Sequence, residues 1–164
     1  MIVKKYLLHN GNLIQRGTNK FVYRNYDKPV PVFPSVQIGN QVWMSENLSI
    51  DDGGGGIKIV QSVIANGYEF GPQTYYSYEA AVRVANSIEG WHLPTSADWS
   101  GLRTYFDGQA LNARSTTGWN NGQNGTNDLG LNIQPVGRLD DISRYDTPNS
   151  RGSEANLWCY NVDN

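Results

Sequence analysis

Residues 90–102, Gly-Trp-His-Leu-Pro-Thr-Ser-Ala-Asp-Trp-Ser-Gly-Leu, carry the clearest folding signal in the chain. Thr95 is followed three residues later by Asp98, which is the spacing of a capping box. The threonine hydroxyl can accept a hydrogen bond from a backbone N–H of the first turn, and the carboxylate lies at the positive end of the helix dipole. The pattern predicts a helix that begins at Ser96.

Apolar residues in the same stretch indicate a hydrophobic core around the start of this helix. Trp99, Leu102 and Phe106 recur at intervals of three and four, so they share one helix face. Further apolar residues come just before Pro94, which disfavours a helical conformation at the residue preceding it. We expect the structural residues of this core to include Trp43, Trp91, His92, Leu93, Trp99 and Leu102.

The composition indicates one folded domain with a short extension. The chain has 164 residues, of which 38% are hydrophobic and 12% aromatic. Eighteen Gly and many Asn indicate frequent turns, hence short strands and loops rather than long helices. Only 17% of the residues are charged and the net charge is -2, so nothing favours binding to nucleic acid. We also expect no membrane insertion, because no apolar segment is long enough.

The beginning of the chain predicts a small β segment. Strands are predicted at residues 2–8, 13–16 and 20–24, and an extended, proline-rich connector at 27–34. Asn10-Gly11 is a favoured tight-turn dipeptide and joins the first two strands into a hairpin. Three strands are too few to bury a core, so we expect residues 1–33 to anchor on the following domain or on another chain.

The rest of the chain predicts alternating short elements. Strands are predicted at residues 36–38, 41–44 and 57–64, and helices at 77–89 and 96–106. Ser77 is the expected N-cap of the first helix, and Gly90 its stop. Residues 51–56 predict a flexible loop, because four consecutive glycines have no side chains to hold them. Residues 107–132 predict a long irregular region held by Trp119.

Four segments of the chain resemble, in order, the signature of the Fibrobacter succinogenes major paralogous domain. They are residues 38–48, 75–81, 90–102 and 118–137. This family consists of C-type-lectin-like modules common in Bacteroidetes and their phages. The resemblance implies an α+β fold: a C-type-lectin-like domain over residues 35–164, with two short helices on a small antiparallel sheet and long loops.

The resemblance also sets an expectation for the end of the chain. In the family, a segment like residues 152–161, around Leu157-Trp158, is one strand of a terminal sheet and further strands follow it. Only three residues follow Asn161 here. Either the domain is a shortened form, or its exposed strand edge is completed by a neighbouring chain. We expect the missing strands to be supplied in trans or replaced by a partner surface, and a homo-oligomer.

No arrangement of residues in the sequence indicates catalysis. Cys159 stands alone, so the chain lacks the paired cysteines of the copper-dependent formylglycine-generating oxidases, which have a related lectin-like fold. We expect Cys159 to be a small buried hydrophobe. His92 is expected to be a hydrogen-bonded structural histidine. The chain is therefore predicted not to be an enzyme and to need no cofactor.

The sequence also departs from the calcium-binding pattern of C-type lectins. Those proteins hold the ion with a Glu-Pro-Asn or Gln-Pro-Asp loop and a Trp-Asn-Asp strand. Here Gln134-Pro135 is followed by Val136, and Trp158 is followed by Cys159. We expect no metal site, with Asp51-Asp52 and Asp140-Asp141 as weak positions for a hard cation.

Aromatic and amide side chains are the remaining candidates for ligand binding. Tyr and Trp offer rigid apolar faces, and Asn offers hydrogen-bond donors and acceptors. The candidate residues are Tyr75, Tyr76, Trp119, Asn120, Asn121, Tyr145, Trp158 and Tyr160. The tryptophans have a competing interpretation as core residues of a loop-rich fold.

The first residues, Met-Ile-Val-Lys-Lys-Tyr-Leu-Leu-His-Asn-Gly, are too polar for a secretory signal. Together with the anchor, the connector and the resemblance, this predicts a non-enzymatic phage virion component, such as a head or tail fibre or a decoration protein. Its expected partners are other virion proteins or copies of itself, through residues 1–33, and a host-surface glycan or protein. The alternative is a secreted or lipid-anchored bacterial carbohydrate-binding module whose leader is absent.

Overall fold

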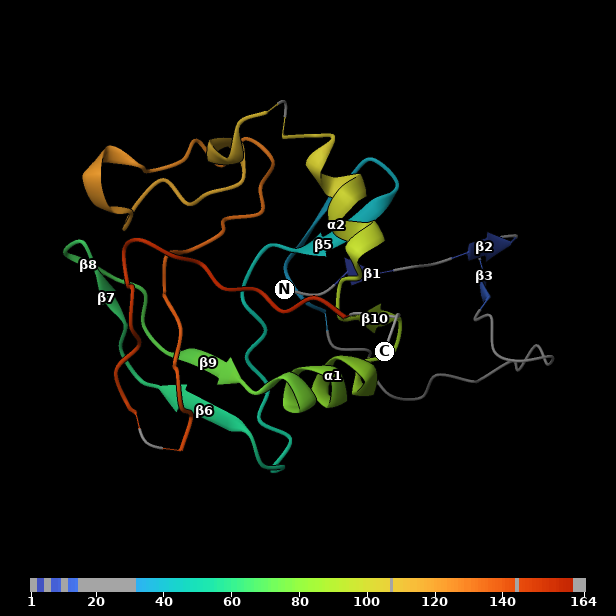
Figure 1. Cartoon of the computed structure of the whole chain (residues 1–164). Helices are drawn as coiled ribbons and strands as arrows, with labels where there is room; N and C mark the ends of the chain where they lie inside the picture. Colours follow the sequence, from blue (N-terminus) through green and yellow to red (C-terminus); the bar gives the residue numbers. More distant parts are fainter. Residues whose placement is uncertain are drawn as a thin grey trace.

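The fold is built on a four-stranded antiparallel sheet (Figure 1). The computed structural model describes residues 3–4, 7–9, 12–14, 32–106, 108–143 and 145–160, the first three ranges as backbone. The sheet has the order β10-β1-β5-β4. Its strands are β1 (Val3–Lys4), β4 (Ser35–Ile38), β5 (Gln41–Met44) and β10 (Trp91–His92). The strands predicted at 36–38 and 41–44 are confirmed as β4 and β5.

The first strand of the chain belongs to this sheet. In β1, Val3 lies opposite Trp43 on one side and His92 on the other. Within the strand predicted over residues 2–8, the structure describes β1 and β2 (Leu7–His9), which belong to different sheets. β1 forms backbone hydrogen bonds with two strands that come from distant parts of the chain, and no local sequence pattern predicts such a pairing. The domain boundary at residue 33 stays a prediction.

The predicted hairpin is confirmed for β2 and β3 (Asn12–Ile14). His9 lies opposite Asn12 in their antiparallel pairing, so the connecting loop has two residues. That loop, the strand predicted at 20–24 and the connector as far as residue 31 lie outside the described residues.

Helix α1 (Tyr78–Ser87) begins as the sequence predicts. Ser77 is its N-cap, with the hydroxyl accepting a hydrogen bond from the Ala80 backbone N–H at 3.3 Å. The helix ends at Ser87 rather than 89, and a turn follows in which Gly90 has φ of 77°. A side chain is disfavoured at that angle. The glycine therefore lets the chain turn directly from α1 into β10.

Helix α2 (Ser96–Arg103) begins with the predicted capping box. The Asp98 N–H donates to Thr95 Oγ1 at 3.2 Å, and the Thr95 N–H donates to Asp98 Oδ2 at 2.9 Å. The helix ends at Arg103, three residues before the predicted end.

The central sheet separates two hydrophobic cores. Successive side chains of a strand point to opposite faces. Met44 and Trp91 therefore pack with the buried face of α1, whereas Trp43 packs with Leu102 of α2. The Trp99 ring lies in the second core, 5.0 Å from the Trp43 ring between centroids. Figure 1 shows the two helices on opposite sides of the sheet.

This arrangement differs from the one core that we expected around both indoles of residues 90–102. The chain turns between β10 and α2, which takes Trp99 to the face opposite Trp91. Trp43, Trp91, Leu93 and Leu102 are at most 7% exposed. His92 and Trp99 are partly buried.

Two small hairpins form a second part of the fold. β6 (Ile57–Val60) pairs with β9 (Gln73–Tyr76), and β7 (Ile64–Ala65) pairs with β8 (Tyr68–Glu69). The strand predicted over 57–64 is therefore interrupted, because residues 61–63 turn the chain inward and bury Val63 completely. Val63 packs with Val60 and Val136 in a third, smaller core.

The described residues 108–132 form the predicted irregular region. It contains only the short 3-10 helices η1 (Ala110–Asn112) and η2 (Asn120–Gly122). Trp119 is 3% exposed, its Nε1–H donates to Ser115 Oγ at 3.1 Å, and the Arg114 guanidinium lies 4.2 Å from the ring centroid. Gly118 has φ of 86°, and a Cβ there would overlap the Phe70 ring. This contact fixes the region against the second part of the fold.

The end of the chain is not the strand that we expected. The described residues of the segment, 152–160, form isolated bridges, from Ala155 to Gly137 and from Tyr160 to Thr95. The Tyr160 N–H donates to Pro94 O at 2.7 Å, so the segment is held by single backbone hydrogen bonds to loop residues rather than by a strand ladder. With two helices and small antiparallel sheets, the class is α+β, as predicted.

The glycine-rich loop 51–56 is anchored, contrary to expectation. Arg83 of α1 holds both carboxylate oxygens of Asp52, at 2.7 and 3.0 Å, and also donates to Gly55 O at 3.0 Å. The side chain that holds the glycines comes from 28 to 31 residues further along the chain.

Candidate functional site

Two hollows with a shared wall lie beside β9, and the larger of them extends to the C-terminal segment. Their volumes are about 310 and 300 Å³. Both are lined by the same five residues, Asn47, Leu48, Gln73, Thr74 and Gln134. We call the two hollows together the groove, the larger one the apolar hollow and the smaller one the polar hollow. Volumes of this size suit small ligands.

Trp158 lies at the edge of the apolar hollow. It is 45% exposed although its Nε1–H already donates to Tyr76 O at 2.9 Å. The Tyr78 ring meets it edge to face, with centroids 5.6 Å apart. These two contacts hold the indole in place while nearly half of the residue stays open to solvent.

Tyr75 and Tyr76 line the apolar hollow with their rings, but their hydroxyls bind backbone. Tyr75 donates to Val136 O at 2.7 Å, and the Tyr76 hydroxyl lies 2.9 Å from Ile50 O. Burial raises the pKa of both hydroxyls, against the smaller opposing effect of Arg151 at Tyr75. Both hydroxyls are therefore neutral at neutral pH, and the two residues form part of the wall of the groove.

Carboxamides supply the polar groups of the groove. Asn47 Nδ2 donates to Gln73 Oε1 at 3.0 Å, and Gln73 Nε2 donates to Phe70 O at 3.3 Å. Within the described part of the chain, the side chains of Asn132 and Gln134 make no hydrogen bond. Each amide can donate and accept, so these two are available to a ligand.

Arg138 lies in the wall of the apolar hollow between two acids. Its Nε–H donates to Asp140 Oδ1 at 2.8 Å and its Nη1 to Glu154 Oε2 at 2.5 Å. The two carboxylates raise the pKa of the guanidinium. Arg138 is therefore charged, and its charge is matched within the protein.

The comparison with family models identifies the domain that carries the groove. The model of the Fibrobacter succinogenes major domain matches residues 36–164. The chain belongs to this family. The comparison with curated proteins found no match, and neither did the comparison with solved structures. Every residue that lines the groove lies within the range matched by this domain.

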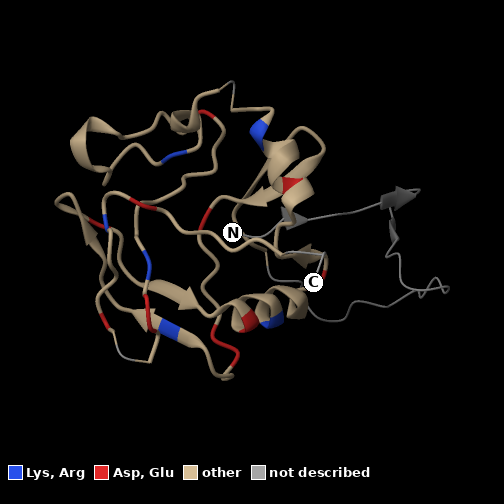
Figure 2. Ribbon diagram, in the orientation of Figure 1, with Lys and Arg blue, Asp and Glu red and all other residues tan. Residues whose placement is uncertain are grey.

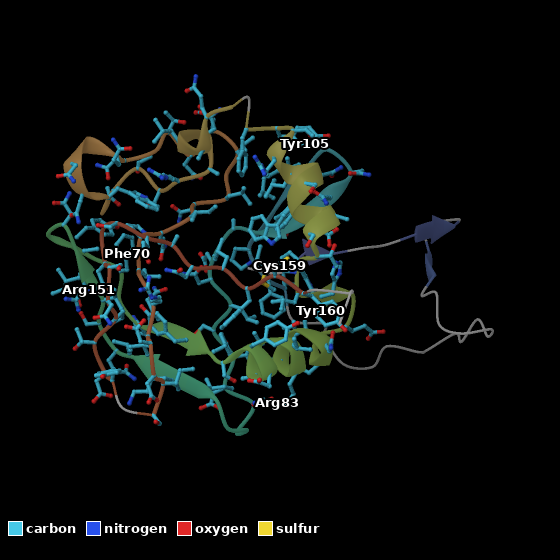
Figure 3. All side chains as sticks on the ribbon, in the orientation of Figure 1. Phe70, Arg83, Tyr105, Arg151, Cys159 and Tyr160 are labelled. Carbon is cyan, nitrogen blue, oxygen red and sulfur yellow. The ribbon has the colours of Figure 1, made fainter. Side chains whose placement is uncertain are left out.

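Of the eight predicted ligand-binding residues, the groove of this major domain brings together Tyr75, Tyr76 and Trp158. Trp119 is buried in the irregular region, and Asn120 donates to Ser153 Oγ at 3.2 Å. The other three are exposed away from the groove lining: Asn121, Tyr145 and Tyr160. Figure 3 shows Tyr160 beside Cys159, near the two helices, and Phe70 and Arg151 on the other side of the view.

The amide residues of the groove were missing from the sequence-based candidates. Asn47, Gln73, Asn132 and Gln134 come from three separate stretches of the chain, and each stands in an ordinary loop or strand context. The only local signal was the pair Gln134-Pro135, which we considered solely as part of a calcium motif.

Other titratable groups of the domain are engaged in structure. His92 Nε2 lies 3.1 Å from Asp98 Oδ2, and Cys159 is partly buried with its Sγ 3.8 Å from Ser96 Oγ. Asp52 and Asp140 are held by arginines, while Asp51 accepts from the Gly53 N–H. Within the described ranges, no group of three or more His, Cys, Asp or Glu side chains is placed to hold a metal ion.

Charge is spread evenly over the described part of the molecule. Figure 2 shows Lys and Arg interspersed with Asp and Glu rather than gathered on one side. None of the helices in the described ranges is long and apolar enough to span a bilayer.

Proposed function

We propose that this chain is a non-enzymatic recognition domain that binds a glycan of a host surface in the groove. Trp158 is the observation that carries the proposal. Its N–H is satisfied by Tyr76 O, yet the residue remains 45% exposed and lines the apolar hollow. An immobilised aromatic ring with an open face provides apolar contact area at little entropic cost, and the C–H face of a sugar ring can stack on it.

The polar hollow complements this ring. Asn132 and Gln134 offer amide donors and acceptors to sugar hydroxyls, and both lie in the same hollow. A sugar chain has both apolar C–H faces and many hydroxyls. Two adjoining hollows of about 300 Å³ each therefore suit an oligosaccharide with one ring against Trp158 and the next among the amides.

The finer fold assignment is also part of the proposal. We assign a C-type-lectin-like domain, supported by family membership, by two short helices around a small sheet and by a long irregular region. In this fold, loops on a rigid frame form the binding surface.

The proposed setting is a phage virion, in which residues 1–33 attach the domain to other virion proteins or to copies of itself. The resemblance to a family found in phages supports it. The β1 pairing ties residues 3–4 to the domain itself, so the attachment would fall to other residues of this segment. Labelling of purified virions with an antibody against the domain tests the setting. Labelling of bacterial surfaces instead would favour the bacterial carbohydrate-binding module.

A glycan array with the full chain tests the binding function. We predict that Trp158→Ala weakens binding of the recognised glycans by about tenfold, because it removes the stacking face. Tyr160→Ala is the matched control, since Tyr160 is 38% exposed and does not line the groove. Equal loss in both variants, or undiminished binding by a folded Trp158→Ala variant, would contradict the proposal.

A further inference from the structure

We infer that the groove selects uncharged glycans, and that Asp140 and Glu154 set this selectivity by neutralising Arg138. The inference rests on the proposed glycan binding and names the class of ligand that the same groove takes.

The geometry around Arg138 leaves it poorly placed to bind an anion. Asp140 occupies its Nε and Glu154 its Nη1, at 2.8 and 2.5 Å. A guanidinium recognises a carboxylate, sulfate or phosphate by offering two parallel N–H groups. Here two of the five N–H groups already serve carboxylates of the protein, so an acidic sugar would meet a cation whose charge is already matched.

Both acids are held in place by amides as well as by Arg138. Asn149 Nδ2 donates to Asp140 Oδ2 at 2.6 Å, and Asn156 Nδ2 donates to Glu154 Oε2 at 3.2 Å. The hydrogen bond from Arg138 lowers the pKa of Asp140 most, and the one from Asn156 lowers the pKa of Glu154 most. Both acids are therefore ionised at neutral pH and keep Arg138 paired.

The remaining charge of the groove also disfavours anions. Among the described residues that line it, Arg138 and Glu46 are the charged ones. Arg138 is paired with Asp140 and Glu154, and Glu46 adds a further negative charge in the lining of the polar hollow, so the balance of these four charges is negative. A sulfated or carboxylated ligand meets no unmatched positive charge along this described lining, whereas a neutral sugar meets amides and an indole.

Arg151 provides a matched comparison for Arg138. It is exposed and lowers the pKa of Tyr75 through its charge, but it is not part of the groove lining. If the charge of the groove wall decides whether a sulfated ligand binds, then that binding should depend on Arg138 and not on Arg151.

The test is an array that carries each neutral glycan beside its sulfated counterpart, probed with the full chain. Wild type is expected to bind neutral members and to reject their sulfated counterparts. Asp140→Asn/Glu154→Gln releases Arg138 and should improve binding to sulfated members by roughly two- to fivefold, since exposed ion pairs have effects of this size. Adding Arg138→Met should abolish the gain, and adding Arg151→Met should preserve it. Rising salt should weaken the gained binding.

The two proposals fail in different ways. A wild-type preference for sulfated members, or no gain in an Asp140→Asn/Glu154→Gln variant that unfolds at the wild-type temperature, would overturn the selectivity. Neutral binding that survives Trp158→Ala would overturn the proposed binding site instead. If the double variant does not fold, Glu154→Gln alone, which keeps the Asp140 pair, should show a smaller gain in the same direction.

Discussion

Asp98 links three elements through one carboxylate. Its Oδ2 accepts from Thr95 at the start of α2 and lies 3.1 Å from His92 Nε2 of β10, while its Oδ1 lies 3.4 Å from Gln41 Nε2 of β5. The capping box and a hydrogen-bonded His92 were predictable from residues 90–102. That the capping acid is also the histidine's partner was not, because this depends on how β10 lies against α2.

We predict that Asp98→Asn lowers the free energy of unfolding at pH 7 by about 1–2 kcal/mol, the usual cost of a weakened cap with its dipole interaction. Chemical denaturation measures this. Asp128→Asn is the control, because Asp128 is exposed and accepts from the neighbouring Thr126 hydroxyl at 2.7 Å. An equal effect of both substitutions would contradict the linking role of Asp98.

The same carboxylate predicts the sign of a pH dependence. Burial raises the pKa of Asp98, but hydrogen bonds from Thr95 and His92 outweigh it and leave the pKa below its ordinary value. The stabilisation is therefore complete above the unfolded-state pKa, near about 4, and is lost as the pH falls through the lower folded-state value. Denaturation midpoints of wild type should fall more steeply below about pH 4 than those of Asp98→Asn. Parallel curves would contradict this assignment.

At the scale of elements, short sequence patterns were sufficient to predict where the helices begin. They did not predict which segments far apart in the chain pair with each other. Both helix starts were predictable because Ser77 and Thr95 cap the residues that follow them. The pairing of β1 with β5 and β10 joins three distant parts of the chain, and the expected terminal strand is an irregular segment shaped by its neighbours. Such pairings depend on packing that only the folded chain brings about.

The loop 51–56 gives a prediction at this scale. The Arg83 guanidinium beside Asp52 holds the pKa of that carboxyl at about 2, so the bidentate pair persists at neutral pH. We predict that Arg83→Met speeds amide hydrogen exchange at residues 53–56 while the thermal midpoint stays nearly unchanged, because exposed ion pairs add little to global stability. Mass spectrometry of exchanged peptides measures this.

Arg83→Lys is the conservative comparison for that experiment. Lysine keeps the charge but cannot form the bidentate pair of hydrogen bonds to Asp52, so it should restore the protection of residues 53–56 from hydrogen exchange only in part. Unchanged exchange in Arg83→Met would mean that the loop is held by something other than α1.

At the scale of the whole molecule, the groove forms where segments that are far apart in the chain fold together. Its walls come from β9, from the residues around Gln134 to Leu139 and from the C-terminal segment with Trp158. The sequence supplied the aromatic half of this surface, since Tyr75, Tyr76 and Trp158 were candidates by residue type. The amide half was missed, because nothing in the sequence places Gln134 in one hollow with those rings or Asn132 in the other hollow.

The central claim is that ligand contact occurs in the groove at Trp158 rather than at the other candidate tryptophan, Trp119. Nuclear magnetic resonance of the full chain, titrated with the tightest-binding glycan of the array, tests it most directly. We predict that the indole Nε1–H signal of Trp158 and the side-chain amide signal of Gln134 shift together, while the Trp119 indole signal stays in place. Shifts confined to Trp119, Asn120 and Asn121, with the signals of Trp158 and Gln134 unmoved, would contradict it.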